Sequence, residues 1–440
     1  MTKTFFTDSS RIMRHPAAIT EADLGECYDR MAHPPTSIAM QSWGVPKSAV
    51  KVVLTALRLM QFCLRTGFGE SPELFGGSTS HPLAGSGQGS GWAPPGFGAL
   101  SSIAIGAYKR DGRGAQITSP YLARAFLLAA VMYVDDTDLL HWAESPESKD
   151  EELIDSVQKD VKVWGEIVQS TGGILKAIKC SLFLLTYKWP NGRARLKPLK
   201  DLPSAPHDVV VATAEGEEDT VYPSHITIPQ PNGTDLPIRT HELEDAVKML
   251  GFYHSLDASK SEHVKEMIKK GMDWVDRMST GKLPRRDAWM SFFAQLLPGI
   301  NWGLVAVVLT PKSLQKYYQS LYYKILPLLG VNRNIGKEWR TLPERYQGLG
   351  LPDFEVHALS KKVHFLQQKW DGKDSTSKIA GSTYEAFMVE VGLYGNIFSR
   401  SWEDLKILAT KHTWYYNLWE LCHRLDVKLE VDEKYHIKPV

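Results

Sequence analysis

The chain lacks the features that mark membrane and secreted proteins. No apolar run reaches the roughly 20 residues that a membrane-spanning helix needs, and the N-terminal "MTKTFFTDSSRIMRHP" has no apolar core of a signal peptide. We therefore expect no membrane partner and an intracellular protein of the nucleus or cytoplasm that is not secreted. The cysteines show no CxxC or Cys/His spacing, which argues against a disulfide framework or a zinc site. They are Cys27, Cys63, Cys180 and Cys422.

The common nucleotide-binding motifs are also missing. The stretch "GSGQGSGWAPP" (85–95) is rich in glycine, but it does not match G-x-G-x-x-G, and the chain has no G-x-x-x-x-G-K-[ST]. A Rossmann or P-loop fold is therefore disfavoured. Such a loop lets a flat ligand approach the backbone closely, with Gln88 offering both a donor and an acceptor. Taken alone, a flexible turn explains it more simply.

The chain has almost no net charge, yet its charge is unevenly distributed. It holds 440 residues with 43% hydrophobic content, enough for one large core or two to three ordinary ones, and its formal charge is +1. Residues 260–345 hold 15 Lys and Arg against 7 Asp and Glu, a local charge of +8. A solvated helix face would explain this, but interleaved aromatics favour a surface that follows a phosphate backbone. These aromatics are Trp274, Trp289, Tyr317, Tyr318, Tyr322 and Tyr323.

Two adjacent aspartates, Asp135 and Asp136, interrupt an apolar stretch in "AVMYVDDTDLLHW" (130–142). Strands normally exclude Asp, and two like charges about 4 Å apart repel by roughly 4 kcal/mol at an intermediate dielectric. A hairpin turn is the simpler interpretation. A metal site is the alternative, because paired carboxylates suit hard divalent cations. An EF-hand is excluded, because Leu139 and Leu140 stand where its glycine would be needed.

The order of the expected elements predicts an α+β fold, an antiparallel sheet with helices on one face. We expect a strand at 17–23, a hairpin around Asp135 and a strand at 181–189. Helices are expected at 47–65, from the glycine-rich loop to about residue 109, and from the acidic stretch 144–160 to about residue 169. Residues 190–247 are predicted to be an insertion or β-rich loop. Helical patterns dominate after residue 259.

Five short motifs, in order, resemble the palm of reverse transcriptases, the RNA-directed DNA polymerases, in particular those of non-LTR-like eukaryotic retroelements. The motifs are "DLGECYDR" with Asp23, "GSGQGSGWAP", "YVDD", "GGILKAIKC" (172–180) and "VKMLGFY" (247–253). A YxDD alone arises by accident now and then, whereas five motifs in the family's order are far more specific. The resemblance covers about residues 17–256, and the helical remainder is compared with a thumb by analogy.

The resemblance implies a right-hand polymerase with a ferredoxin-like palm at 17–256, interrupted by the insertion at 190–247, and a helical thumb and C-terminal region at 257–440. Residues 1–16 would be a remnant of the fingers. Only 22 residues precede Asp23, whereas the family carries there a fingers region that clamps the triphosphate. The chain is therefore expected to be an N-terminally truncated retrotransposon frame whose activity is in doubt.

By the same resemblance, Asp23, Asp135 and Asp136 would be catalytic and would hold two Mg²⁺ ions, with Mn²⁺ as a possible substitute. The ions would offset the carboxylate repulsion, activate the primer 3′-hydroxyl and hold the triphosphate. Lys179 falls where the family has a Lys near the leaving pyrophosphate, and Lys176 is its nearer rival. An exposed loop charge explains either lysine about as well.

The resemblance also implies contacts with an RNA or DNA template, a DNA primer and dNTPs. Tyr28 would lie under the incoming sugar and exclude a 2′-hydroxyl, and Gln88 and Gly89 would pack against template and nucleotide. Tyr133 and Val134 would line the primer terminus. The primer would be gripped by a second hairpin, although a plain core hairpin explains it nearly as well. That hairpin carries Met249, Leu250 and Gly251.

Two alternatives stay open. The chain could be a catalytically impaired retroelement remnant that only binds nucleic acid. A viral-type RNA polymerase is a weaker option, because those enzymes carry a second Asp where Tyr28 stands and Gly-Asp-Asp in the hairpin. The family also has Ser before the Pro of the glycine-rich motif, where this chain has Ala93. No endonuclease, RNase H or integrase signature is visible, and protein partners are unknown.

Overall fold

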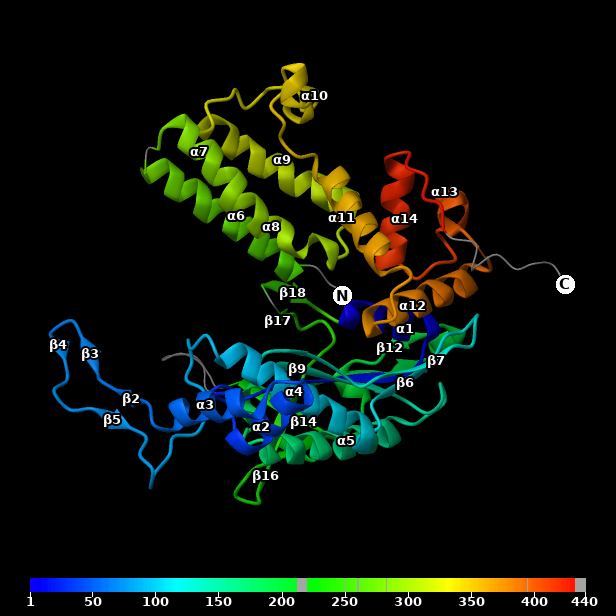
Figure 1. The fold of residues 1–440 in the computed structure, drawn as a ribbon. Helices are drawn as coiled ribbons and strands as arrows, with labels where there is room; N and C mark the ends of the chain where they lie inside the picture. The colour runs from blue at the N-terminus through cyan, green and yellow to red at the C-terminus, as the bar shows by residue number, and fades with distance from the viewer. Residues whose placement is uncertain (212–219, 250, 259–260, 282, 394, 432–440) are drawn as a thin grey trace. The chain divides into compact units, whose positions relative to one another are not determined.

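The computed structural model describes residues 1–211, 220–249, 251–258, 261–281, 283–393 and 395–431. They form two compact units, described separately (Figure 1). The sheet unit comprises residues 16–117 and 126–242. The helical unit comprises residues 1–15, 118–125 and 243–440. No helix in the described ranges is both long and apolar enough to cross a membrane.

A six-stranded sheet is the centre of the sheet unit. Its spatial order is β15-β16-β10-β1-β9-β8, and β1 is antiparallel to both of its neighbours. β8 pairs with β9 in antiparallel fashion, whereas β16 is parallel to β10. The strands are β1 (Ala17–Asp23), β8 (Ala130–Tyr133), β9 (Asp136–Trp142), β10 (Ser181–Leu185), β15 (Ile226–Pro229) and β16 (Asp235–Thr240).

Helices cover one face of this sheet. Alternate residues of the central strands, such as Ala18, Leu139 and Leu182, pack in one apolar cluster with α4 and α5. Tyr108 of α4 meets Trp164 of α5 edge to face at 5.5 Å, and both are fully buried. The expected α+β class is therefore confirmed. The helices of the unit are α2 (His33–Ser42), α3 (Lys47–Arg58), α4 (Ala93–Asp111) and α5 (Asp150–Ser170).

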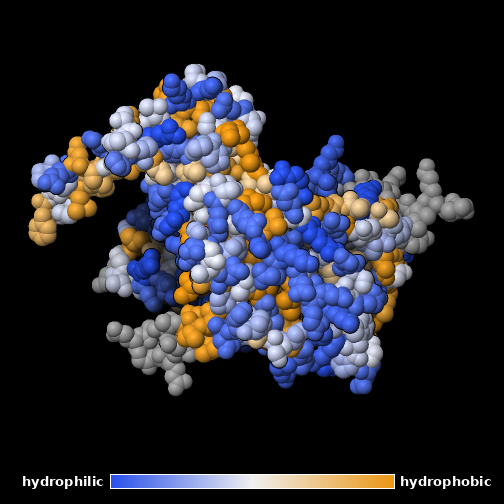
Figure 2. Space-filling view, turned by 90° about the horizontal axis from the view of Figure 1, so that it is seen from below, coloured by the Kyte–Doolittle hydropathy of each residue, from blue (hydrophilic) through white to orange (hydrophobic). Residues whose placement is uncertain are grey.

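The helix expected at 47–65 is shorter in the structure than predicted. α3 ends at Arg58, and the chain then forms an arm of two small sheets that extends from this helix (Figure 1). Glycine is required where the arm closes, because a Cβ at Gly77 would lie 1.6 Å from the Arg58 carbonyl oxygen. Apolar side chains of the arm are exposed (Figure 2), Phe68 completely. The strands are β2 (Gln61–Phe62), β3 (Arg65–Thr66), β4 (Gly69–Glu70) and β5 (Phe75–Gly76).

The region 190–247, predicted as an insertion or β-rich loop, also contributes two strands to the central sheet. The expected strand at 181–189 divides, because β10 ends at Leu185 and the chain continues into a separate hairpin. Further on, β15 and β16 join the central sheet beside β10, so the end of the region belongs to the sheet. Additional strands are β6 (Ala115–Thr118), β7 (Ala125–Leu128), β11 (Tyr187–Lys188), β12 (Arg195–Leu196), β13 (His207–Val211) and β14 (Thr220–Ser224).

The helical unit contains the helices expected after residue 259, together with the N-terminal helix α1. The Ser9 hydroxyl of α1 lies 2.8 Å from the Thr383 hydroxyl of α12, and the Asp8 carboxylate accepts a hydrogen bond from the Trp414 amide. The segment expected as a fingers remnant is thus part of this unit. Its elements are α1 (Thr2–Met13), β17 (Val247–Met249), β18 (Phe252–His254), α6 (Ser261–Gly281), α7 (Arg285–Ser291), α8 (Leu297–Asn301), α9 (Pro311–Leu328), α10 (Lys337–Thr341), α11 (Phe354–Lys369), α12 (Ser375–Val391), α13 (Trp402–Leu405) and α14 (Trp414–Arg424).

The aromatic residues of the basic segment 260–345 do not form the expected surface. Trp274, Tyr317 and Tyr318 are buried, and the Tyr317 hydroxyl donates to the Met267 carbonyl at 2.7 Å. Tyr322 is also buried, whereas Tyr323 is 52% exposed. The helical spacing of 317, 318, 321, 322 and 325 turns one side of α9 inward, so most of these rings belong to the core.

Candidate active site

The YVDD motif forms the predicted hairpin. Tyr133 of β8 pairs with Asp136 of β9, which leaves a two-residue turn of Val134 and Asp135. Val134 has a φ of 57°, in the left-handed region that a β-branched residue rarely adopts. Backbone of this kind costs on the order of 1–3 kcal/mol and persists only where its surroundings impose it. Here a backbone hydrogen bond from Leu24 to the Asp135 carbonyl, 3.2 Å long, holds the turn against the end of β1.

The strand register brings the predicted aspartates together. Asp23, the last residue of β1, lies opposite Asp136 in the antiparallel ladder, and Asp135 precedes it in the turn. Residues directly opposite in such a pair have Cβ atoms about 5 Å apart. Because side chains alternate along strands, Asp23 and Asp136 lie on the sheet face opposite α4 and α5. Tyr133 follows in the same cross-strand row.

Two further acids, Glu21 and Asp138, lie in the next row of that face. Partial burial, and then the charges of Asp135, Asp23, Asp138 and Glu21, raise the pKa of Asp136 above its ordinary value. The sequence analysis missed Glu21 and Asp138. Their signal was the two-residue spacing from the predicted aspartates, which is the period of a strand.

The structure distinguishes the two candidate lysines by position. The Lys179 ammonium lies 3.6 Å from an Asp23 carboxylate oxygen and remains 58% exposed. Lys176 instead pairs with Glu26 at 4.0 Å, and its side chain passes over Gly25. Its backbone amide donates to the Asp23 carbonyl at 3.0 Å. Lys179 is therefore the lysine whose charge contacts the predicted carboxylates.

The glycine-rich loop packs against the segment that follows β1. The Ser86 backbone amide donates to the Tyr28 carbonyl at 2.8 Å, and the Gln88 backbone amide donates to the Asp29 carboxylate at 3.2 Å. Gly89 has a φ of +90°, and both Gln88 and Gly89 are exposed. The structure thus brings together two nucleotide-binding candidates that lie 60 positions apart in the sequence.

Tyr28 lies near the hairpin as well. Burial raises the pKa of Tyr28, and the nearby Cys27, Asp135 and Tyr133 raise it further. Its ring meets Phe97 of α4 edge to face at 5.6 Å. Tyr28 therefore lies between the glycine-rich loop and the hairpin, whereas the Tyr133 side chain is 61% exposed beside them.

Two buried thiols complete the site, although the spacing of the cysteines did not indicate it. The Asp23 amide lies 3.4 Å from the Cys180 sulfur, and burial raises the pKa of Cys180 to about 12. Burial, followed by the charge of Asp135, raises the pKa of Cys27 to about 11. Both thiols are therefore neutral near pH 7. Their signal was their position inside two of the five motifs.

The predicted primer-grip residues fall in the helical unit. Met249 ends β17, and Gly251 follows with a φ of +89° in the turn to β18. Leu250 lies outside the described residues. A hairpin is therefore present at 247–254, and its contact with a primer remains a prediction.

The carboxylates suit a divalent cation in chemistry but are not arranged as a finished metal site. Asp23, Asp135 and Asp136 offer the hard oxygen ligands that Mg²⁺ prefers, and burial, followed by the neighbouring carboxylate charges, raises the pKa of Asp136. Within the described part of the chain, however, no group of three or more His, Cys, Asp or Glu side chains is placed to hold a metal ion. Binding would require these side chains to turn toward a common point.

Comparisons with known proteins leave the family open. No protein-family model and no curated protein matches the chain. Similar solved structures include telomerase from Candida albicans in complex with a TWJ fragment of telomeric RNA, at 12% identity and a TM-score of 0.36, covering 92% of this chain and 52% of that chain. Apo telomerase from Candida tropicalis gives 9% identity and a TM-score of 0.33, covering 94% and 55%. The chain spans about half the length of both, and likeness at this level supports no conclusion.

Proposed function

We propose that the chain is a reverse-transcriptase-like nucleotidyltransferase that adds deoxynucleotides to a primer 3′-hydroxyl on an RNA or DNA template. The observation that carries the proposal is the pairing of Asp23 with Asp136 across β1 and β9, with Asp135 beside them in a strained turn. Backbone hydrogen bonds hold this placement, so the carboxylates stay together despite their repulsion. Proteins retain such an arrangement at functional sites more often than elsewhere.

In this proposal Asp23, Asp135 and Asp136 hold two Mg²⁺ ions. When bound, these would activate the primer hydroxyl and stabilise the charge on the leaving pyrophosphate. Lys179 is placed beside Asp23, where its ammonium can donate a proton to the departing phosphate oxygen. Because its side chain is flexible and exposed, the Lys179 ammonium can leave the Asp23 carboxylate and pair with a substrate anion instead.

The chain's other residues orient the substrates. The Tyr28 ring contacts Phe97 edge to face and lies near Asp135, and in this proposal it packs against the incoming sugar. Gln88 and Gly89 present an exposed amide and an open backbone to the base pair. Tyr133 and Val134 would contact the primer terminus. The hairpin that holds Met249, Leu250 and Gly251 would bind the primer strand.

A protein that only binds nucleic acid is the second candidate. It is favoured by the absence, among the described side chains, of a three-ligand metal group. Under this alternative the carboxylates would be a relic of an ancestral retroelement enzyme. The two candidates differ in whether divalent cations bind at the hairpin.

Primer extension with the purified chain tests the choice. On an RNA template with Mg²⁺ or Mn²⁺, the parent should extend a DNA primer and Asp135→Asn should not. Glu147→Gln is the matched control, because it neutralises an exposed acid of the same unit away from the hairpin. In parallel, Mg²⁺ should raise the melting temperature of the parent and of Glu147→Gln but not of Asp135→Asn. A parent that neither extends primers nor responds to either ion would leave the binding protein as the better description.

Sugar choice tests the position of Tyr28. Tyr28→Ala should admit ribonucleotides, because removing the ring opens space at the 2′ position. The measurement is the ratio of dCTP to CTP in single-nucleotide addition, with Tyr346→Ala as a control that removes an exposed aromatic ring of the helical unit. An unchanged ratio in Tyr28→Ala would remove this residue from the nucleotide site.

A further inference from the structure

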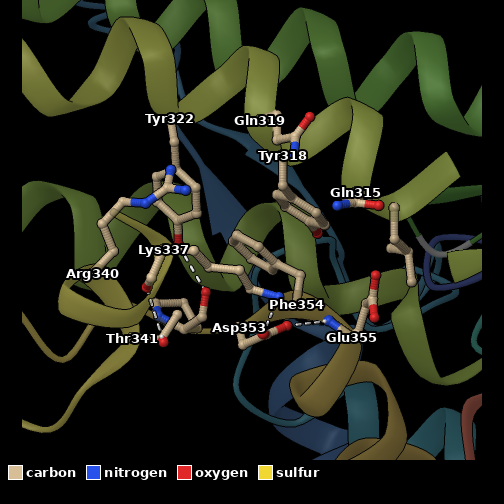
Figure 3. A pocket seen from close by; sticks show the side chains of 12 residues that line it. Gln315, Tyr318, Gln319, Tyr322, Lys337, Arg340, Thr341, Asp353, Phe354 and Glu355 are labelled. Atoms are coloured by element: carbon tan, nitrogen blue, oxygen red, sulfur yellow. Dashed lines mark hydrogen bonds and ion pairs between the residues drawn. The ribbon is translucent and has the colours of Figure 1, made fainter. Parts of the chain in front are cut away.

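A small pocket in the helical unit has the character of a ligand site. It lies between α9, α10 and the first residues of α11 (Figure 3), and its volume is about 90 Å³. A single water needs roughly 10–15 Å³ on this measure, so the pocket has room for several waters or a planar ring.

One wall of the pocket is aromatic. Tyr318 and Tyr322 point from α9 toward Phe354, the first residue of α11 (Figure 3). Tyr318 stacks on Phe354 with an angle of 5° between the rings, and Tyr322 is tilted by 37° to Phe354. The Tyr322 hydroxyl donates to the Pro352 carbonyl at 2.9 Å, which fixes that ring. The wall is therefore rigid and suits a flat, weakly polar ligand.

The charges around the pocket do not cancel. Lys337 pairs with Asp353 at 2.7 Å, and Arg424 pairs with Glu355 at 2.8 Å. Arg340 has no carboxylate partner among the described residues, and its guanidinium carbon lies 5.5 Å from the centre of the Tyr322 ring. The positive charge of Arg340 at the edge of the aromatic wall is therefore not neutralised by a described carboxylate, and it would attract an anionic group.

Two buried polar atoms at the pocket have no hydrogen-bond partner among the described residues, namely the Tyr318 hydroxyl and the Arg340 Nε. Tyr318 is only 4% exposed. Burial, together with the neighbouring Tyr317 and Tyr322, raises the pKa of Tyr318, so the hydroxyl keeps its proton and can donate. Leaving such a group unsatisfied costs on the order of 1–3 kcal/mol, which a ligand with acceptor atoms would recover.

We propose that this pocket binds a nucleotide unit, with its base against the aromatic wall and its phosphate beside Arg340 and Lys337. The base provides a flat ring with acceptor nitrogens and carbonyls that the Tyr318 hydroxyl can reach. Gln315 and Gln319 line the pocket with carboxamides, whose donors and acceptors match those of base edges. The phosphate provides the anion that balances Arg340. The inference goes beyond the polymerase proposal and does not require the carboxylates.

The nucleotide could be a free mononucleotide or one residue of a single strand, and binding measurements distinguish the two. The full chain is titrated with the four nucleoside 5′-monophosphates, with the matching nucleosides and with inorganic phosphate, by calorimetry. A fluorescein-labelled single strand of about 12 nucleotides is titrated in parallel, with the monophosphates as competitors. Binding of the strand alone identifies a strand residue, and binding of the monophosphate without competition by the strand identifies a free nucleotide.

Conservative variants link the binding to the pocket. Tyr318→Phe removes only the hydroxyl and should weaken binding about 3- to 10-fold, and Arg340→Gln should weaken it about 10-fold or more. Arg345→Gln is the control, because Arg345 stacks on Tyr346 outside the pocket. It should change binding less than about twofold, and melting curves verify that each variant folds.

The proposal is overturned if neither the monophosphates nor the strand binds, if phosphate alone binds as tightly as the monophosphates, or if Tyr318→Phe and Arg340→Gln bind like the parent. The Asp135→Asn variant should bind as the parent does. Failure of primer extension with intact binding would therefore count against the polymerase proposal only.

Discussion

The hairpin of the sheet unit and the basic segment of the helical unit share one sequence pattern, in which charges alternate with aromatic or apolar residues. In the structure the two patterns have different consequences. At the hairpin, Asp23, Asp135 and Asp136 meet at the end of two paired strands. In the basic segment, most of the aromatics expected at the surface point into the core, as Tyr317 does. The first pattern locates a candidate site, and the second largely describes packing.

The difference follows from the geometry of the two elements. Side chains alternate strictly along a strand, so a register that pairs Asp23 with Asp136 also decides which face both occupy. A helix turns by about 100° per residue, so Tyr322 and Tyr323, although adjacent, end up on opposite sides of the core boundary. Composition alone does not reveal that boundary.

The largest expected effect is the loss of catalysis at the hairpin. Under the proposed function, Asp23→Asn should lower nucleotide incorporation on the order of 1000-fold, about 4 kcal/mol of barrier, because it removes a charge from the proposed metal site. Single-turnover primer extension measures the loss, and circular dichroism verifies the fold. Glu151→Gln, at an exposed position of α5, is the control. Asp29→Asn is less suitable, because the Asp29 carboxylate accepts a hydrogen bond from the Gln88 backbone amide. Equal rates for Asp23→Asn and the parent would contradict the site.

Substitutions of the buried aromatics in the basic segment should instead lower the stability of the fold. Tyr317→Ala should lower the free energy of unfolding by about 3 kcal/mol, because it empties a buried site and removes the hydrogen bond from the Tyr317 hydroxyl to the Met267 carbonyl. Tyr323→Ala should cost less than about 1 kcal/mol, since that ring is half exposed and contacts mainly Arg333. Urea unfolding of the two variants measures the contrast. Similar losses would mean that the two tyrosines are not divided between core and surface.

A buried carboxylate under the sheet, that of Asp160, gives a pH-dependent test. Burial alone would raise the pKa of Asp160, but hydrogen bonds from His141 and from the Arg113 and Gly114 amides hold it below its ordinary value. Its contribution is therefore present above the unfolded pKa of about 3.9 and is lost as pH falls through the lower, folded value. Asp160→Asn should cost about 2 kcal/mol at pH 7. The difference from the parent should shrink below about pH 4 in acid-unfolding curves; a constant difference would contradict the pKa shift.

The smallest expected effect is a gain in stability, from substitution of Asp136. The raised pKa of Asp136 means that the folded state binds its proton more tightly, so stability falls as pH rises through the interval between the unfolded and folded pKa values. Above that interval Asp136→Asn should stabilise the chain, by less than about 1 kcal/mol because the side chain is partly exposed. Melting in EDTA measures the gain. Adding Mg²⁺ should stabilise the parent more than the variant, and an identical response of the two would argue against metal binding.

Much of the sheet unit could be predicted from the sequence. The strand at 17–23, the hairpin at Asp135 and the helices that follow them were expected from local periodicity and turn chemistry, which depend on neighbouring residues. The arm after Arg58 was not, because glycines fit a loop as readily as the close backbone approach at Gly77. The contribution of β15 and β16 to the sheet was also missed, since β16 pairs with β10 through residues almost 60 positions apart.

Side-chain type and order along the chain are local properties, so the residues able to do chemistry could be read from the sequence alone. It identified Asp23, Asp135 and Asp136 and left Lys176 and Lys179 as equals. Packing between distant segments brings Lys179 against Asp23 and adds the charges of Glu21 and Asp138 to the same face. It also buries the Tyr318 hydroxyl, which has no hydrogen-bond partner among the described residues. Distance, burial and the rotation of a helix about its axis depend on what packs against each residue, and in this fold those neighbours come from far along the chain.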